Sequence, residues 1–284
     1  MKICIDRPIN FLSDGLHLFD RHDILQRKFK QNYHGKRAAL LETYQEFLAR
    51  INTFEKRELH YGYRYFMGNP SISLKVDKNN TFRSFYGDTV VFALDDAVKK
   101  KLAAYTDLLY QSASECFCER LVPGTLHVTL HDLSNAPALR DVAEALFENE
   151  LRAIAKMEAL KKFENYKIKM KSKYIFNMVD VSLVLGLYPA SEDEYLRLME
   201  LYSVFDDVRK LDYPFTPHIT LAYYNINGFP PQTARTLEDT VKRLNHQEEF
   251  ELELNTDHLY YQKFRSMNDY INIFSFKYNA GSRT

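Results

Sequence analysis

The chain repeats one pattern of strand, helix and strand at an interval of 91 residues. Each copy begins with an apolar run typical of a buried strand, at Thr89–Leu94 and again at Val181–Leu187. A short His-x-Thr-Leu strand follows, beginning at His127 in the first copy and at His218 in the second. In both copies this strand begins 37 residues after a valine of the apolar run. Such an interval is too long for a solenoid repeat and fits a duplicated α+β lobe.

Helices are expected at corresponding places in the two copies. Asp95–Tyr110 and Ser191–Val208 both begin with acidic residues, which suit the positive end of a helix dipole. A second helix is expected over Arg140–Lys162, with an apolar stripe that includes Leu151 and Ile154, and over 231–244 in the other copy. Each half is then expected to close with alternating strands, at 166–171 in the first and at 250–254, 258–264 and 271–278 in the second.

The first 86 residues match neither copy. Leu16–Phe29 and Arg37–Phe54 are predicted helices. The turn signal Asn79–Asn80 predicts a hairpin between strands at Ser71–Val76 and Thr81–Phe85. No Gly/Ser-rich linker follows, so we expect this part to pack on the rest of the chain.

The domain prediction follows from this division. We expect a helical N-terminal extension with a hairpin over residues 1–86 and a bilobal domain over 87–284. The two lobe repeats are expected at about 87–174 and 178–278. The fold class is therefore predicted to be α+β, with two antiparallel sheets flanked by helices and a central cleft.

The two His-x-Thr strands carry the same polar pair on one face. Because side chains alternate along a strand, His127 and Thr129 share a face, as do His218 and Thr220. Lobes related by a pseudo-twofold axis would bring the four side chains into one cleft. Two imidazoles supply a general base and a general acid near neutral pH, and two hydroxyls can donate to phosphoryl oxygens. This set predicts cleavage of a phosphodiester, such as a 2′,3′-cyclic phosphate, with no metal or other cofactor.

On these residues the chain resembles the 2H phosphoesterase superfamily. That superfamily is defined by two His-x-Thr/Ser motifs, one in each lobe of a duplicated α+β fold, and the matching stretches here are His127-Val-Thr129-Leu and His218-Ile-Thr220-Leu. The resemblance covers about residues 87–278 and implies a duplicated bilobal 2H phosphoesterase-like fold. It also implies catalysis by both histidines and phosphate contacts from both threonines.

The activity implied by the resemblance is that of a metal-independent phosphodiesterase. Its substrate would be a cyclic or a 2′,5′- or 3′,5′-linked phosphodiester of a nucleotide or of an RNA end. Many RNA-acting members carry an arginine soon after a motif, whereas this chain continues with His131-Asp132 and Tyr223-Tyr224. This difference favours a small nucleotide over a long RNA.

Alternatives without catalysis stay open at this point. The chain could be a nucleotide- or RNA-binding module on the same fold, or an interaction protein whose first 86 residues bind a partner. For His127 and His218 the structural alternative is a pair of hydrogen-bonded core histidines, although buried polar groups cost free energy unless they are paired. Intact His and Thr at all four positions favour an enzyme, because a binding module needs no acid–base pair. The repeat makes the two histidines formally equivalent, so base and acid are not assigned.

Three further side chains are candidates for substrate binding. Strand alternation puts His131 on the face of His127, where it lines the rim of the cleft or is a surface histidine. By the same rule Tyr224 shares the face of His218 and either stacks on a base or closes the core. Tyr86, just before the first repeat strand, is a third stacking candidate. A zinc site from His127 and His131 fails on geometry unless a bulge intervenes, because four residues of a strand span roughly 13 Å.

Composition excludes several other classes. Lys plus Arg and Asp plus Glu both number 38, so the net charge of zero excludes a globally basic nucleic-acid coat. No apolar run reaches about 18 residues, and the N-terminus lacks the features of a signal peptide. Three cysteines cannot form a disulfide framework, and Cys116-Phe-Cys118 suits neither a zinc knuckle nor a redox pair. We therefore expect a cytoplasmic protein with no membrane association, no metal and no obligate protein partner.

Overall fold

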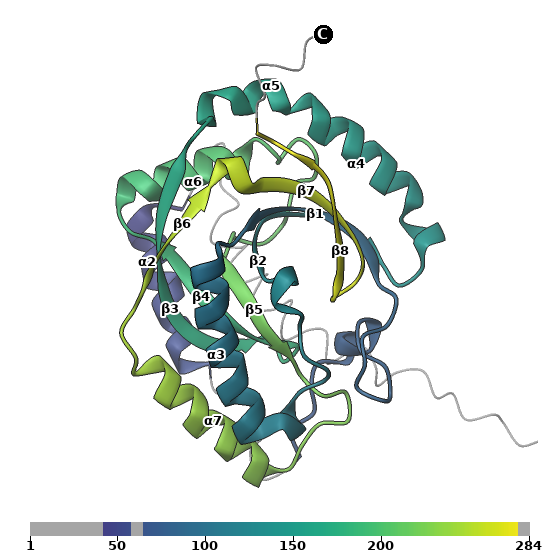
Figure 1. Cartoon of the computed structure of the whole chain (residues 1–284), viewed down its shortest axis with the longest axis vertical. Coiled ribbons are helices and arrows are strands. Elements are labelled where there is room, and N and C mark those ends of the chain that lie inside the picture. The colour runs from purple at the N-terminus through teal and green to yellow at the C-terminus, as the bar shows by residue number, and fades with distance from the viewer. Residues whose placement is uncertain (1–41, 58–64, 278–284) are drawn as a thin grey trace, which may run out of the picture. The chain divides into compact units, whose positions relative to one another are not determined.

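The strands of this chain form two four-stranded antiparallel sheets (Figure 1). The structure is a computed structural model that describes residues 42–57 and 65–277. One sheet has the order β2-β1-β7-β8, built from β1 (Tyr86–Ala93), β2 (His127–Ala136), β7 (Leu259–Ser266) and β8 (Asp269–Ser275). The other has the order β5-β4-β3-β6, built from β3 (Lys167–Met178), β4 (Ser182–Pro189), β5 (His218–Tyr223) and β6 (Glu251–Asn255). The predicted α+β class with two antiparallel sheets is confirmed.

The two His-x-Thr strands are β2 and β5, and each is an edge strand of its sheet. The two edges contact one another, so the sheets meet along the strands that carry the motifs. Within residues 42–57 and 65–277, no further strand pairs with the free edge of either motif strand. This arrangement places both motifs at the junction of the sheets.

The two sequence halves exchange their closing strands. The sequence pattern assigns the strand that becomes β3 to the first half, but β3 pairs with β4 and β6 of the second half. Conversely, β7 and β8 come from the second half, and β7 pairs with β1. The sequence-based assignment of closing strands to halves is therefore wrong, because residue alternation identifies a strand but not its partner. Each sheet contains strands from both halves, which ties the lobes together.

The helices begin where capping residues predict. Asp95 accepts a hydrogen bond from the Val98 amide at the start of α3 (Asp96–Ala113), and Ser191 accepts one from the Glu194 amide at the start of α6 (Glu192–Ser203). The other helices are α2 (Tyr44–Asn52), α4 (Ala143–Ala155), α5 (Met157–Leu160) and α7 (Pro231–Asn245), and 3-10 turns lie at Thr53–Lys56, Pro70–Leu74, Ser114–Cys116, Pro123–Thr125, Leu139–Asp141, Lys161–Phe163 and Thr256–His258.

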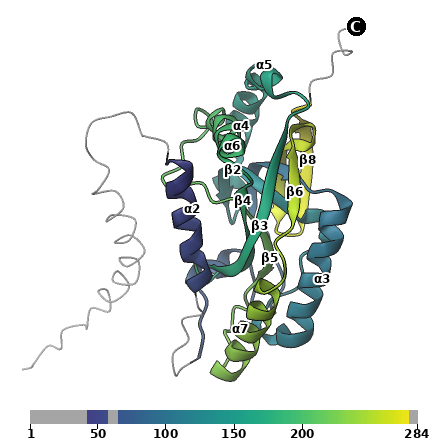
Figure 2. The same cartoon turned by 90° about the vertical axis from the view of Figure 1, so that its left-hand side faces the viewer.

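These helices lie on both sides of the second sheet. In Figure 2, α2 and α6 lie on one side of β3 and α3 lies on the other, with α7 packed against α3. Helix α4 packs on β1, β2 and β7 of the first sheet. None of the helices within the described ranges is long and apolar enough to span a membrane.

Helix α4 buries a different face from the predicted apolar stripe. Leu146 is buried as expected, but Leu151 and Ile154 are 54% and 45% exposed. The face toward the sheet instead carries Asn149 and Ala153. Asn149 is there because its amide donates hydrogen bonds to the Asp88 carboxylate and the Ser134 hydroxyl beneath the helix. A buried carboxylate needs such partners, and this requirement sets the rotation of the helix.

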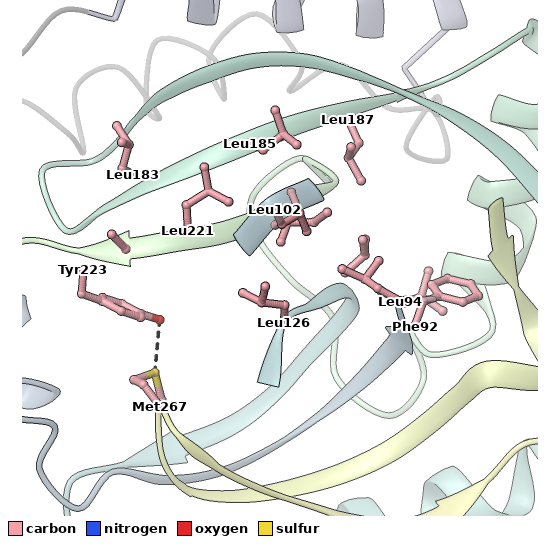
Figure 3. Close-up of a cluster of buried hydrophobic side chains, with 14 of the residues drawn as sticks. Phe92, Leu94, Leu102, Leu126, Leu183, Leu185, Leu187, Leu221, Tyr223 and Met267 are labelled. Carbon is pink, nitrogen blue, oxygen red and sulfur yellow. Dashed lines mark hydrogen bonds between the residues drawn. The ribbon is translucent and has the colours of Figure 1, made fainter. Parts of the chain in front are cut away.

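One hydrophobic core continues through both sheets. Figure 3 shows a part of it, to which β4 contributes Leu183, Leu185 and Leu187, β5 contributes Leu221 and α3 contributes Leu102. Each such fully buried leucine contributes on the order of 1.5–3 kcal/mol relative to an exposed one. The core thus holds the motif strands from the side opposite their polar side chains.

The segment before β1 differs from the predicted hairpin. The predicted strand at Ser71–Val76 is mainly a 3-10 helix, Pro70–Leu74, because Asn69 caps the Ser71 amide and Pro70 occupies the first helical position. The chain then turns at Asn80, whose φ of 61° suits asparagine, and a single bridge joins Val76 to Phe82.

Only part of the predicted N-terminal extension is described. The helix expected at Leu16–Phe29 lies outside the described residues. Within Arg37–Phe54 the structure has α2, which begins with a capping box between Thr43 and Glu46. The chain from Thr43 onward forms one compact unit. The boundary between residues 86 and 87 stays a prediction.

Candidate active site

The structure brings the four motif side chains together. His127 and Thr129 from β2 and His218 and Thr220 from β5 line one cleft of about 200 Å³. The cleft follows from the contact between the two edge strands, since each strand turns the same face of its motif toward the other half. Two imidazoles and two hydroxyls are thus available to one bound group.

Each motif histidine is held by the same backbone bond. His127 Nδ1 lies 2.7 Å from the carbonyl oxygen of Thr125, and His218 Nδ1 lies 2.7 Å from that of Thr216. A carbonyl only accepts, so Nδ1 carries the proton in both rings. The neutral ring then offers the lone pair of Nε2 to the cleft. The bond fixes both the tautomer and the orientation of each ring.

The residues whose carbonyls accept these hydrogen bonds reveal a longer motif than His-x-Thr. Thr125-Leu-His127 and Thr216-Pro-His218 both place a threonine two residues before the histidine. The sequence interpretation missed these positions, although the repeated Thr-x-His-x-Thr pattern is a signal that could have found them. Their carbonyls are what orients the imidazoles.

Burial and a nearby carboxylate act in opposite directions on the pKa values of the two histidines. Burial lowers the pKa of both His127 and His218, which favours the neutral form that a general base needs. The Asp132 carboxylate raises both pKa values, which favours the protonated form that a general acid needs. Lys75 lowers the pKa of His218, and His218 itself lowers that of His127.

A β-bulge follows the threonine of each motif. In the first sheet Val91 pairs with Thr129 but Val90 pairs with His131, so Leu130 is an extra residue in β2. Such a bulge moves the side chains that follow it to the opposite face, up to the next irregularity of the strand.

The second sheet has the same irregularity at the corresponding place. Val184 pairs with Thr220 but Leu183 pairs with Ala222, which makes Leu221 the extra residue in β5. The duplication therefore includes the bulge as well as the motif. Strand alternation counted from the histidine fails beyond this point in both halves.

The prediction that His131 shares a face with His127 is wrong for this reason. His131 is only 1% exposed and does not line the cleft. Its ring stacks on Tyr202 at 4.8 Å, and its Nε2 lies 3.5 Å from Asp206 Oδ1. Asp132 takes the cleft-facing position in its place.

The prediction that Tyr224 shares the face of His218 fails in the same way, and the alternative that this side chain closes the core is confirmed. Tyr224 is fully buried against Phe66, Phe117 and Phe229, away from the cleft. Tyr223 lines the cleft instead, and its hydroxyl donates to the sulfur of Met267 at 3.1 Å (Figure 3).

The third substrate-binding candidate, Tyr86, is the first residue of β1 and pairs with Ala136. It is half-buried and does not line the cleft. None of the three side chains offered for substrate binding therefore reaches the motif histidines.

Asp132 is the acidic side chain that the sequence interpretation missed. It lines the cleft, and its Oδ2 accepts a hydrogen bond from the Tyr213 hydroxyl at 2.9 Å. Tyr213 lies in the loop before β5, so this bond joins the two halves beside the histidines. Without the bulge, nothing in the sequence pattern points Asp132 into the cleft.

Aromatic side chains form the remaining wall of the cleft. Phe85, Phe264 and Tyr270 lie beside one another, and the ring of Tyr270 contacts that of His127 at 5.0 Å. Apolar walls around a few convergent polar groups are typical of small-molecule sites. Flat rings next to two imidazoles suit a ligand that carries an aromatic ring.

The thiols of Cys116 and Cys118 do not line this cleft. Among residues 42–57 and 65–277, no group of three or more His, Cys, Asp or Glu side chains is arranged to hold a metal ion. Cys116 and Cys118 are buried elsewhere, and burial raises the pKa of each thiol to about 12. Neither is a thiolate nucleophile at neutral pH.

Comparison with solved structures identifies the fold. A conserved protein of unknown function from Agrobacterium tumefaciens, ATU0111, superposes over 77% of this chain and 98% of its own at 14% identity, with a TM-score of 0.55. TT0787 of Thermus thermophilus covers 68% of this chain and 99% of its own at 13% identity and a TM-score of 0.44. E. coli LigT in its apo form covers 67% of this chain and 95% of its own at 14% identity, with a TM-score of 0.37.

Sequence comparison adds no relative to these. No family model matches the chain, and no curated protein matches it. The likeness to ATU0111 concerns the fold and no activity. The two antiparallel sheets meet along the edge strands that bear the His-x-Thr motifs, and over 77% of this chain the fold is similar to that of ATU0111.

Proposed function

We propose that this protein is a metal-independent phosphodiesterase. Its substrate is a cyclic or a 2′,5′- or 3′,5′-linked phosphodiester of a nucleotide or of an RNA end. The observation that carries this proposal is the paired bond at the histidines, which leaves one Nε2 from each half free in a cleft with two threonine hydroxyls. A pure binding site has no need to hold two imidazoles in the same tautomer.

The reaction follows from the roles that these groups can take. Nε2 of one neutral histidine accepts a proton from water while the water oxygen forms a bond to phosphorus. The bond from phosphorus to the departing sugar oxygen breaks, and the protonated Nε2 of the other histidine donates a proton to that oxygen. One water is added across one P–O bond, and exchange with solvent restores both histidines. The hydroxyls of Thr129 and Thr220 donate to the non-bridging oxygens, where negative charge grows.

The test is a panel of phosphodiesters offered to the full chain in the presence of EDTA. The panel contains 2′,3′-cyclic and 3′,5′-cyclic mononucleotides, ADP-ribose 1″,2″-cyclic phosphate, 2′,5′-linked dinucleotides and RNA with a 2′,3′-cyclic end. We expect one class to be hydrolysed, with a rate that chelation leaves unchanged. His127→Ala and His218→Ala should each lower the rate by about 10²–10⁴-fold.

His258→Ala is the matched control, because this histidine is exposed and lies outside the cleft. It should keep the wild-type rate. Full activity in either cleft variant, or loss of activity in EDTA, would refute the mechanism. A folded protein that binds nucleotides but hydrolyses none of the panel would instead be the non-catalytic binding module.

A further inference from the structure

The cleft receives a lysine from outside the duplicated halves. Lys75 follows the 3-10 helix Pro70–Leu74, in the segment before β1, and lines the cleft with both motif histidines. Phe85, from the same segment, lines it as well. The segment that precedes the repeats is therefore part of the site wall.

Lys75 is held in place by two aromatic rings and by its own backbone. Its Nζ lies 5.3 Å from the centre of the Phe85 ring and 5.3 Å from that of Tyr223. Its amide donates to the carbonyl of Ile72, and its carbonyl accepts from the amide of Arg83. Cation–π contacts fix the ammonium over the rings without neutralising its charge.

No carboxylate of the described residues forms an ion pair with Lys75. Asp132, the carboxylate of the same cleft, accepts a hydrogen bond from the Tyr213 hydroxyl. Lys167, by contrast, forms an ion pair with Glu253 on an exposed surface. An unneutralised ammonium facing a cleft is a binding group for an anion.

The position of Lys75 also makes the two halves unequal. Tyr223 occupies, after the bulge in β5, the place that Asp132 occupies after the bulge in β2. Lys75 lies over that tyrosine and is close enough to His218 to disfavour a second positive charge there. The other groups that act on His218 are the Thr216 carbonyl and Asp132, both of which favour protonation. Asp132 acts on His127 as well, and the positive charge that acts on His127 is that of His218 itself, so Lys75 is the permanently charged group that acts on His218 alone.

We infer that Lys75 binds a non-bridging phosphoryl oxygen of a nucleotide-sized phosphodiester and makes His218 the general base. This inference rests on the proposed function and assigns its roles. His218 Nε2 takes the proton of the attacking water, and the protonated Nε2 of His127 gives a proton to the departing sugar oxygen. The Lys75 ammonium donates a hydrogen bond to phosphate throughout and gains strength as charge grows on the oxygen. Lys75 thus supplies a positive charge in place of the arginine that is missing after the two His-x-Thr motifs of this chain.

The experiment compares Lys75→Met with Lys75→Arg and with a matched control. Lys78→Met removes a lysine three residues away that is exposed and does not line the cleft. Inorganic phosphate is titrated into each full-length variant, and the imidazole proton signals of His127 and His218 report binding. Lys75→Met should weaken phosphate binding by about tenfold, whereas Lys75→Arg and Lys78→Met should bind like the wild type.

Once a substrate that the protein hydrolyses is known, Lys75→Met should lower kcat/KM for it by about tenfold or more. The variant should also shift the acid-side limb of the pH–rate profile to higher pH, since His218 would then hold its proton more tightly. Equal phosphate binding by Lys75→Met and wild type, equal weakening in Lys78→Met, or no phosphate-induced shifts in the wild type would each overturn the inference. Because phosphate binding needs no turnover, these outcomes are separate from a failure of the proposed activity, which would appear as an inert substrate panel.

Discussion

Leu130 and Leu221 are extra residues at the same point of the two motif strands, each directly after the threonine of a His-x-Thr motif. The bulge at each leucine turns the following side chain away from the cleft and brings the next one into it. Asp132 and Tyr223 therefore join the site, while His131 and Tyr224 enter the core. The chemistry of the cleft depends on this irregularity as much as on the motifs.

Because the bulge in β5 turns Tyr224 into the core, its hydroxyl should lower the stability of the fold. Among the described residues it has no hydrogen-bond partner although it is fully buried. Tyr224→Phe should raise the free energy of unfolding by about 1 kcal/mol, because an unpaired buried hydroxyl is removed without loss of packing. Urea unfolding measures this change. Turnover should stay at the wild-type level, and a loss of turnover would place the hydroxyl in the cleft instead.

Asp132 should control the pH dependence of turnover. Its carboxylate raises the pKa of both His127 and His218, so Asp132→Asn should lower both. Both limbs of the pH–rate profile should then move to lower pH, and the rate on the alkaline side should fall by about tenfold.

Tyr213→Phe is the control for this variant, because it removes the hydrogen bond to Asp132 and keeps the charge. It should leave the limbs near their wild-type positions. Movement of only one limb in Asp132→Asn would show that the carboxylate acts on one histidine alone.

The two buried histidines should make stability fall in mild acid. Their pKa values in the folded chain lie below the ordinary value of about 6.5, so the unfolded chain binds more protons as pH drops through that value. Stability is thus fully present above about pH 6.5 and is lost below it, by at most about 1.4 kcal/mol per pH unit for each histidine. Urea unfolding at several pH values between 8 and 5 measures how steeply the free energy of unfolding falls with pH. The double variant His127→Gln, His218→Gln should flatten this dependence, and an unchanged slope would assign the effect to other groups.

The sequence predicted correctly those structural features that depend on contacts between residues close together in the chain. Asp95 and Ser191 cap helices through contacts within three residues, and both helix starts were predicted correctly. The sheet to which β3 belongs depends on residues far away in the chain, and the sequence pattern, which placed this strand in the first half, did not indicate it. The bulges at Leu130 and Leu221 leave no mark on hydrophobic alternation, because a leucine fits the core on either register.

A buried carboxylate behind the first sheet should carry much of the stability of that lobe. Asp88 is 2% exposed and accepts from the Tyr261 hydroxyl at 2.6 Å, the Ser134 amide at 2.7 Å and the Asn149 amide at 3.3 Å. Tyr261→Phe should lower the free energy of unfolding by about 1–3 kcal/mol, because it removes a hydrogen bond to a buried charge. Urea unfolding tests this, with Tyr260→Phe on the neighbouring, half-buried residue as the control. Equal losses in the two variants would contradict the role of Asp88.

Arg50 of α2 should act as a positioning residue for His218. Its guanidinium donates to the Thr216 hydroxyl and to the Phe215 carbonyl, both at 2.9 Å, and the Thr216 carbonyl in turn holds the histidine ring. In the first half the hydroxyl of Thr125 bonds within its own loop, so only the second histidine depends on a helix from before the repeats. Arg50→Met should lower kcat by about tenfold with little change in KM, because the ring is displaced while the phosphate contacts remain.

The pH–rate profile separates this role from a general loss of stability. The bond from the Thr216 carbonyl raises the pKa of His218, so a loosened loop should lower that pKa and move one limb of the profile to lower pH. Lys56→Met, at an exposed residue of the turn after α2, should change neither kcat nor the profile. If Arg50→Met lowered stability but left kcat and both limbs unchanged, Arg50 would serve only to pack α2, and His218 would need no support from outside its own lobe.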